Sequence, residues 1–173
     1  RNPAAPCTTS TLQQEAVRKL GMTTDRTMRT AQQLYEGIDV GQGAIGLITY
    51  MRTDSVTLSE DALVEIRHYI ENKLDKNFLP SKANVYKTKA KNAQEAHEAI
   101  RPTSIYRTPE EVKPFLNNDQ FRLYQMIWKR TVASQMNPAK FDLTSVDIEM
   151  GNGIFRTTGQ IQTFAGFLSV YEE

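Results

Sequence analysis

Residues 46–55, GLITYMRTDS, carry a phenol, a guanidinium and a carboxylate at alternate positions. Tyr50 precedes Arg52 by two residues and Asp54 by four. A phenol ionises with a pKa of about 10, so attack on phosphorus at neutral pH requires removal of its proton and cations that offset the phosphate charge. The guanidinium of Arg52 would supply that charge, because its planar fork fits a phosphate better than an ammonium does. Asp54 is expected to orient Arg52 or the backbone of the turn.

A second group of polar side chains lies in residues 94–103, QEAHEAIRPT. The imidazole of His97 can donate a hydrogen bond or carry a proton near neutral pH. Glu98 is expected to hold a neighbouring cation or His97 in place. Arg101 precedes Pro102, so it is expected to cap the end of a short helix.

The residues from 81 to 91 include four lysines and no acidic residue: Lys82, Lys87, Lys89 and Lys91. Such a run is expected to be a solvated loop, and the alternative is a groove that tracks phosphates. Over the whole chain, 21 basic residues balance 20 acidic ones, so any contact with a polyanion has to come from local clustering.

The bulk composition limits the class of protein. With 173 residues, of which 39% are hydrophobic, the chain can form a compact core. A single cysteine, Cys7, excludes an internal disulfide, and no stretch approaches the roughly 18 apolar residues of a membrane span. These features favour a cytoplasmic protein without a membrane partner. Because the sequence begins at Arg1 without a methionine or signal peptide and ends in what reads as a strand, it is expected to be an excised fragment.

Helical signals dominate residues 1–136. Capping residues and apolar spacing predict helices that begin near Ser10, Thr24, Ser59, Asn92, Thr108 and Asp119. The helix from Asn92 would end before Pro102 and hold His97. Residues 47–50 have the β-branched and aromatic character of a short buried strand, with Tyr50 at or near its end. Tyr124 and Trp128 lie four residues apart, which predicts core packing.

The hydrophobic period changes beyond Pro138. Val146, Ile148 and Met150 alternate with acidic residues, which predicts a strand, and residues 151–153, GNG, predict a hairpin turn. The β segment is expected to continue to the end of the chain. It offers few strands and has exposed edges, so it is expected to belong to a larger sheet. The predicted fold is therefore mainly α with a short antiparallel β segment, divided into residues 1–136 and 137–173.

The two polar segments resemble motifs of the bacterial type IA DNA topoisomerase family. Residues 46–55 resemble its active-site motif, and residues 94–103 resemble its second signature. Residues 8–16, TTSTLQQEA, and 31–36, AQQLYE, are also similar to the family. The similarity covers nearly the whole chain.

The resemblance implies a role for each candidate residue. Tyr50 would attack one DNA strand and become joined to its 5′ phosphate, Arg52 would contact the scissile phosphate, and His97 would lie beside that phosphate. Supporting roles are implied for Thr49, Asp54 and Glu98, and DNA contacts for Arg52, His97 and Arg101.

The resemblance also implies what the whole enzyme does. It would relax negatively supercoiled DNA by transient single-strand cleavage, strand passage and religation without ATP. Its partners would be single-stranded and negatively supercoiled DNA and the remaining domains of the parent enzyme, close to the nucleoid. The β segment from 137 to 173 resembles part of the arch that joins the tyrosine domain to the rest. Nothing in the chain resembles the family's acidic metal-binding module. No metal ligand or cofactor is therefore expected here, Mg²⁺ is expected in the full-length parent, and the fragment alone is expected to be inactive.

Two other interpretations account for part of the sequence. A site-specific recombinase also uses a tyrosine, but with a His-x-x-Arg motif before it. Here His97 and Arg101 are four apart and both follow Tyr50, so order and spacing count against a recombinase. The other alternative is a non-catalytic DNA-binding or structural module in which Tyr50 only packs.

Overall fold

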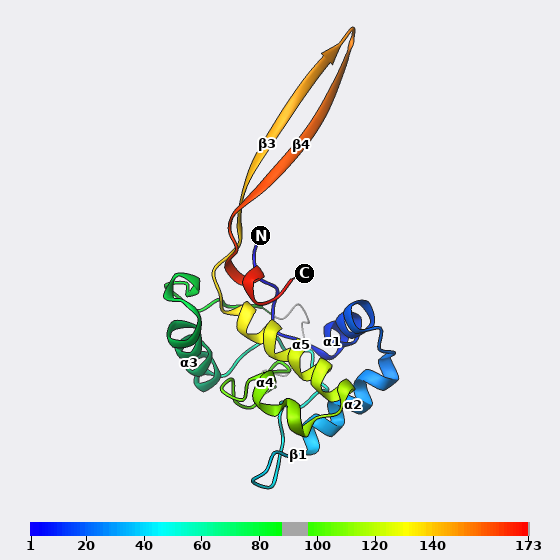
Figure 1. Ribbon diagram of the computed structural model, residues 1–173, viewed down its shortest axis with the longest axis vertical. Coiled ribbons are helices and arrows are strands. Elements are labelled where there is room, and N and C mark those ends of the chain that lie inside the picture. Colours follow the sequence, from blue (N-terminus) through cyan, green and yellow to red (C-terminus); the bar gives the residue numbers. More distant parts are fainter. Residues whose placement is uncertain (88–96, 173) are drawn as a thin grey trace.

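The computed structural model describes residues 1–87 and 97–172, and it shows a helical body from which a long β-hairpin projects (Figure 1). The α-helices described are α1 (Thr9–Glu15), α2 (Thr24–Glu36), α3 (Glu60–Tyr69), α4 (Pro109–Val112) and α5 (Asn118–Ser134). Helical turns of π type extend α1 as η1 (Ala16–Leu20) and α3 as η2 (Ile70–Leu74), and 3₁₀ turns form η3 (Lys76–Phe78), η4 (Lys113–Phe115) and η5 (Gly166–Ser169). Among the described helices, none is long and apolar enough to cross a membrane. The mainly helical prediction is confirmed for the described part of the chain.

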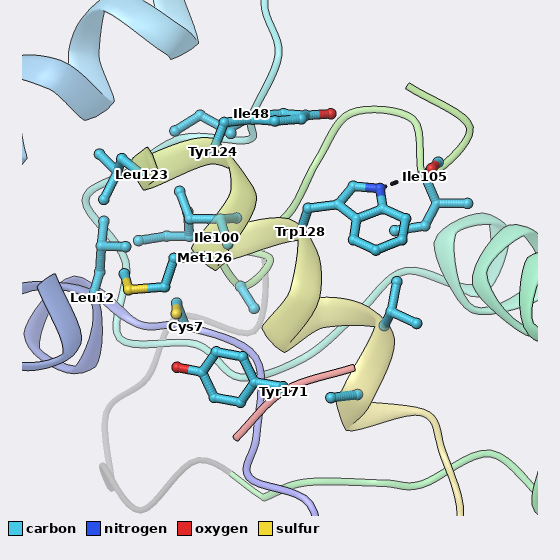
Figure 2. Close-up of a cluster of buried hydrophobic side chains, with 14 of the residues drawn as sticks. Cys7, Leu12, Ile48, Ile100, Ile105, Leu123, Tyr124, Met126, Trp128 and Tyr171 are labelled. Atoms are coloured by element: carbon cyan, nitrogen blue, oxygen red, sulfur yellow. Dashed lines mark hydrogen bonds between the residues drawn. The ribbon is translucent and has the colours of Figure 1, made fainter. Parts of the chain in front are cut away.

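Helix α5 runs through the hydrophobic core. Its Tyr124 is fully buried and its Trp128 is 7% exposed, which confirms the prediction of core packing for this pair. The indole Nε1 of Trp128 donates a hydrogen bond to the carbonyl oxygen of Ile105 at 2.9 Å. Figure 2 shows Leu12 of α1 and the side chains of Ile48 and Ile100 beside α5. Burial of these two isoleucines anchors both motif segments to the same core.

Most predicted helix starts agree with the structure. The hydroxyls of Ser59 and Thr108 cap α3 and α4, and α2 begins at Thr24. Helix α1 begins at Thr9, and the N-cap expected at Ser10 is wrong by two residues. Thr8 caps α1 instead, because its hydroxyl accepts from the N–H of Thr11 while the Thr11 hydroxyl accepts from the N–H of Thr8.

The predicted β segment forms one antiparallel hairpin. Strand β3 (Lys140–Met150) pairs with β4 (Gly153–Phe164), and Ile148 lies opposite Phe155. Gly151 turns the chain with a φ of 59°, a conformation that favours glycine. Among the described residues no further strand pairs with either edge. The smaller hairpin of β1 (Ile38–Asp39) and β2 (Ala44–Ile45) forms in the glycine-punctuated stretch before Tyr50.

The expectation that the chain stays β to its end is wrong. After β4 the chain turns back to the body, where η5 forms and Phe167 is fully buried. Gly166 makes this turn with a φ of 52°, and a Cβ there would lie 2.5 Å from the carbonyl oxygens of Asn137 and Pro138. The close approach of the two backbones therefore requires glycine and ends the strand.

Candidate active site

The segment that carries Tyr50 is fixed by backbone contacts to two other parts of the chain. The N–H of Leu47 donates to the carbonyl of Leu34 in α2 at 2.7 Å, and the N–H of Thr103 donates to the carbonyl of Leu47 at 2.9 Å. Ile48 forms a single β-bridge with Pro102. The predicted strand over residues 47–50 is therefore wrong, because proline has no N–H with which to extend the ladder.

Thr49 joins the first motif to the second. Its hydroxyl donates to the carbonyl of Ala99 at 2.7 Å and accepts from the N–H of Arg101 at 3.0 Å. Its N–H donates to the carbonyl of Arg101 at 2.9 Å. Two segments that lie about 50 residues apart in sequence are thereby held side by side.

A helix was predicted from Asn92 to Arg101. Residues 92–96 lie outside the described residues, and the prediction is wrong for residues 97–101, which are not helical. The reason is that their backbone groups bond to other segments. The N–H of Ala99 donates to the carbonyl of Thr57, and that of Ile100 donates to the carbonyl of Cys7, both at 2.8 Å.

Side chains of residues 51–55 alternate between the core and the surface. Met51, Thr53 and Ser55 are buried, whereas Arg52 and Asp54 are exposed. The extended backbone is held by Thr9 at the start of α1, whose hydroxyl donates to the carbonyl of Met51 and accepts from the N–H of Thr53, both at 2.8 Å. This alternation turns Arg52 and Asp54 to the same side.

Arg52 and Asp54 face an open groove of about 600 Å³, and His97 from the second motif lines it as well. The rest of the lining comes from Thr8, Thr9, Ser10, Gln13 and Thr53. No ion pair holds Arg52 or Asp54 among the described residues. The guanidinium of Arg52 is therefore available to an anion that enters the groove.

The start of α1 contributes to the groove, which the sequence did not predict. Ser10 was expected only as a helix start, and no role at the site was expected for residues 8–16. Thr8, Ser10 and Gln13 line the groove together with Arg52. The available signal was the run of four hydroxyl residues at 8–11, but such a run is also an ordinary capping sequence.

Tyr50 lies at the surface and is not among the residues that line this groove. Its side chain is 42% exposed. The ring of Tyr35 packs against it edge to face, with ring centroids 5.4 Å apart and an interplanar angle of 63°. Tyr50 is thus two residues from Arg52 and accessible to a macromolecule.

Glu98 and Arg101 pair with each other. The Nε of Arg101 donates to Glu98 Oε2 at 2.5 Å, and Nη1 donates to the carbonyl of Pro102 at 3.0 Å. Burial by itself raises the pKa of Glu98, but hydrogen bonds from Arg101 and Ser59 outweigh it, so this pKa lies below its usual value. The Arg101 side chain is 15% exposed and is engaged by Glu98. His97 is exposed and lines the groove.

The lysine run is only partly described. Lys82 and Lys87 are exposed, and Lys89 and Lys91 lie outside the described residues. Within the described residues no group of three or more His, Cys, Asp or Glu side chains could hold a metal ion. The described residues therefore offer no fitting ligand set for the Mg²⁺ expected in the parent enzyme.

Comparison with known proteins agrees with the two motifs. A family model described as DNA topoisomerase matches residues 1–173. DNA topoisomerase 1 of Xylella fastidiosa (strain Temecula1) is 62% identical, with 100% of this chain and 22% of that protein covered. DNA topoisomerase 1 of Rickettsia felis is 50% identical, with 100% and 23% covered. The solved full-length topoisomerase I from Thermotoga maritima matches with a TM-score of 0.86 at 41% identity, over 99% of this chain and 27% of that one.

A match over every residue defines the class of protein as a DNA topoisomerase. The chain belongs to this family, in the bacterial type IA class that its motifs resemble. It spans 22% to 27% of the length of these relatives.

Proposed function

We propose that this chain supplies the nucleophile and the phosphate-binding side chains of a full-length type IA topoisomerase that relaxes negatively supercoiled DNA. The observation that supports this most is the groove. It gathers Arg52 and His97 from motifs that are far apart in sequence, next to the segment that bears the exposed Tyr50. A cation and an imidazole in one groove, with an accessible phenol two residues along the chain from the cation, fit phosphoryl transfer better than they fit packing.

In the proposed reaction the Tyr50 hydroxyl attacks the phosphorus of one DNA strand. The bond from phosphorus to the 3′ oxygen breaks, the phenol proton leaves, and the 3′ oxygen takes up a proton. Arg52 offsets the negative charge that develops on the phosphate, and His97 donates a hydrogen bond or carries the proton. The 5′-phosphotyrosine ester keeps the bond energy, so the 3′ hydroxyl can reverse the reaction after strand passage without ATP. Thr49, Asp54 and Glu98 support this arrangement, and Arg101 is the further DNA contact in the proposal.

The remaining parts of the proposal concern the whole protein. Residues 1–136 form the tyrosine-bearing domain and residues 137–173 contribute to the arch. The exposed apolar side chains of β3 and β4, such as Ile148 and Phe155, support this, since they suit burial against more of the protein.

Mg²⁺ binds to a module outside this chain. The isolated chain should therefore not relax supercoiled plasmid. The full-length enzyme would act on single-stranded regions of cytoplasmic, nucleoid-associated DNA.

The test is Tyr50→Phe in the full-length protein. This change removes only the hydroxyl and leaves the ring that packs on Tyr35. We expect loss of plasmid relaxation and of the covalent adduct with labelled single-stranded DNA on a denaturing gel, while non-covalent DNA binding persists through phosphate contacts. Tyr106→Phe, at a tyrosine that is 38% exposed, is the matched control. An adduct with normal turnover in the Tyr50→Phe protein would favour the non-catalytic alternative for Tyr50.

A further inference from the structure

The end of α2 lies unusually close to the segment that carries Tyr50. The carbonyl of Leu34 accepts from the N–H of Leu47 at 2.7 Å. A Cβ on Gly46 would lie 2.7 Å from the carbonyl oxygen of Tyr35. Glycine at 46 therefore permits a backbone contact that no other residue type would allow without displacement.

This contact sets the ring of Tyr35 against the ring of Tyr50. Their centroids are 5.4 Å apart at an interplanar angle of 63°, the edge-to-face arrangement that aromatic quadrupoles favour. The two tyrosines are 41% and 42% exposed, so both remain partly accessible to solvent. Among the described residues no hydrogen bond holds the Tyr50 hydroxyl, and no other aromatic ring contacts this residue.

A phenol on the surface can rotate about its side-chain torsions, and attack on phosphorus requires one orientation of its oxygen. A neighbouring ring removes part of this freedom before DNA binds. Tyr35 itself is held in place, because it belongs to the last turn of a 13-residue helix whose Leu34 is fully buried.

We propose that Tyr35 is a positioning residue, which holds the Tyr50 ring in the orientation for attack. This inference rests on the proposed role of Tyr50 as nucleophile. The ring of Tyr35 carries the effect and its hydroxyl does not, since the contact is between rings. A phenylalanine at position 35 would therefore preserve the function, and an aliphatic or small residue would not.

The experiment uses the full-length protein with Tyr35→Ala, Tyr35→Leu and Tyr35→Phe. Tyr106→Ala is the matched control, because Tyr106 is 38% exposed and packs edge to face on Tyr69 at 5.6 Å. The first-order rate of adduct formation is measured at saturating labelled single-stranded oligonucleotide, and Kd is measured separately by fluorescence anisotropy. Thermal unfolding checks that each variant folds. Tyr35→Leu keeps an apolar side chain on α2, so it still tests the proposal if Tyr35→Ala does not fold.

We expect Tyr35→Ala and Tyr35→Leu to lower the adduct rate roughly 10- to 100-fold with Kd within about twofold of wild type, as misorientation of a reacting group does. Tyr35→Phe and Tyr106→Ala should stay within about twofold of the wild-type rate. An unchanged rate in Tyr35→Leu, a defect confined to Kd, or a defect in Tyr35→Phe as large as in Tyr35→Leu would each overturn the inference. Tyr50→Phe is measured in parallel. If it still forms the adduct, the proposed function fails, whereas loss there with a normal Tyr35→Leu rate refutes only the role of Tyr35.

Discussion

In the helical body, segments far apart in sequence hydrogen-bond to one another, whereas β3 and β4 pair only with each other among the described strands. Such bonds join residues 7–9, 46–57 and 97–103, and each of these segments contributes to the lining of the groove. In the hairpin the register follows from the turn, and side chains such as Met150 remain 70% exposed. The body thus fixes a site by tertiary contacts, and the hairpin presents a surface built from local ones.

The two regions also use charge differently. In the body, Glu15 accepts a hydrogen bond from Tyr171 at 2.5 Å and lies 3.8 Å from Arg130, and the carboxylate is 11% exposed. On the hairpin, Arg156 makes a bidentate pair with Asp147, but its side chain is 68% exposed. The buried cluster joins α1, α5 and the chain end, so its loss should lower the stability of the whole body. The hairpin pair contributes less, because solvent screens it.

The largest difference in DNA cleavage is expected between substitutions of two exposed arginines, Arg52 in the body and Arg156 on the hairpin. Arg52→Ala in the full-length protein should lower single-turnover DNA cleavage by roughly 100-fold, since a cation that offsets transition-state charge is lost. Arg52→Lys should be milder, because it keeps the charge and loses only the fork. Arg156→Ala should leave cleavage unchanged. Equal cleavage by the Arg52→Ala and Arg156→Ala proteins would remove Arg52 from the site.

The second prediction concerns the stability of the body. Arg130 donates from Nε to the carbonyl of Ala5 at 2.8 Å, and its side chain is 10% exposed. Arg130→Ala should lower the free energy of unfolding by about 3 kcal/mol, because it leaves the Glu15 charge buried with one partner fewer. Urea unfolding of the chain, followed by circular dichroism, measures this change, with Arg156→Ala as the control that should match wild type. An Arg130→Ala protein with the wild-type free energy of unfolding would show that the cluster does not stabilise the body.

The third prediction is a pH dependence. Burial alone raises the pKa of Glu15, but the hydrogen bond from Tyr171 and the charges of Lys19, Arg130 and Arg18 outweigh it, so the pKa lies below its ordinary value of 4.5. A carboxylate with a lowered pKa in the folded state stabilises the protein above pH 4.5, and this contribution is lost as the pH falls through the folded-state pKa. Glu15→Gln should therefore be less stable than wild type at pH 7, and the difference should shrink below about pH 4. Urea unfolding across pH 3 to 7 measures it, and a difference that is independent of pH would refute the assignment.

The smallest effect is expected on the hairpin. Ile148 is 50% exposed and lies opposite Phe155, which is 61% exposed. Ile148→Ala should change the free energy of unfolding of this chain by less than about 0.5 kcal/mol, as is usual for surface substitutions. Ile66→Ala in the core, where the side chain is 2% exposed, is the comparison and should cost about 2 kcal/mol or more. A hairpin variant as damaging as the core variant would mean that the apolar strand faces are covered within this chain.

Local signals predicted the elements that depend on local contacts. The caps at Ser59 and Thr108, the apolar repeat of α5 and the turn at 151–153 all lie within a few residues of what they determine. The strand predicted at 47–50 and the helical end predicted at 97–101 are wrong, because the backbone groups of these residues bond to distant segments. The position of Tyr35 against Tyr50 could not be predicted either, since it depends on how α2 packs.

The most direct test of the central claim is to find which residue carries the DNA. The covalent adduct of the full-length protein is trapped with denaturant, digested with nuclease and trypsin, and sequenced by peptide fragmentation. Cleavage after Arg29 and Arg52 yields a peptide of residues 30–52 that contains both Tyr35 and Tyr50, so fragment ions have to distinguish the two. We predict that the nucleotide phosphate is on Tyr50. A phosphate on Tyr35, or on any residue outside this peptide, would contradict the account.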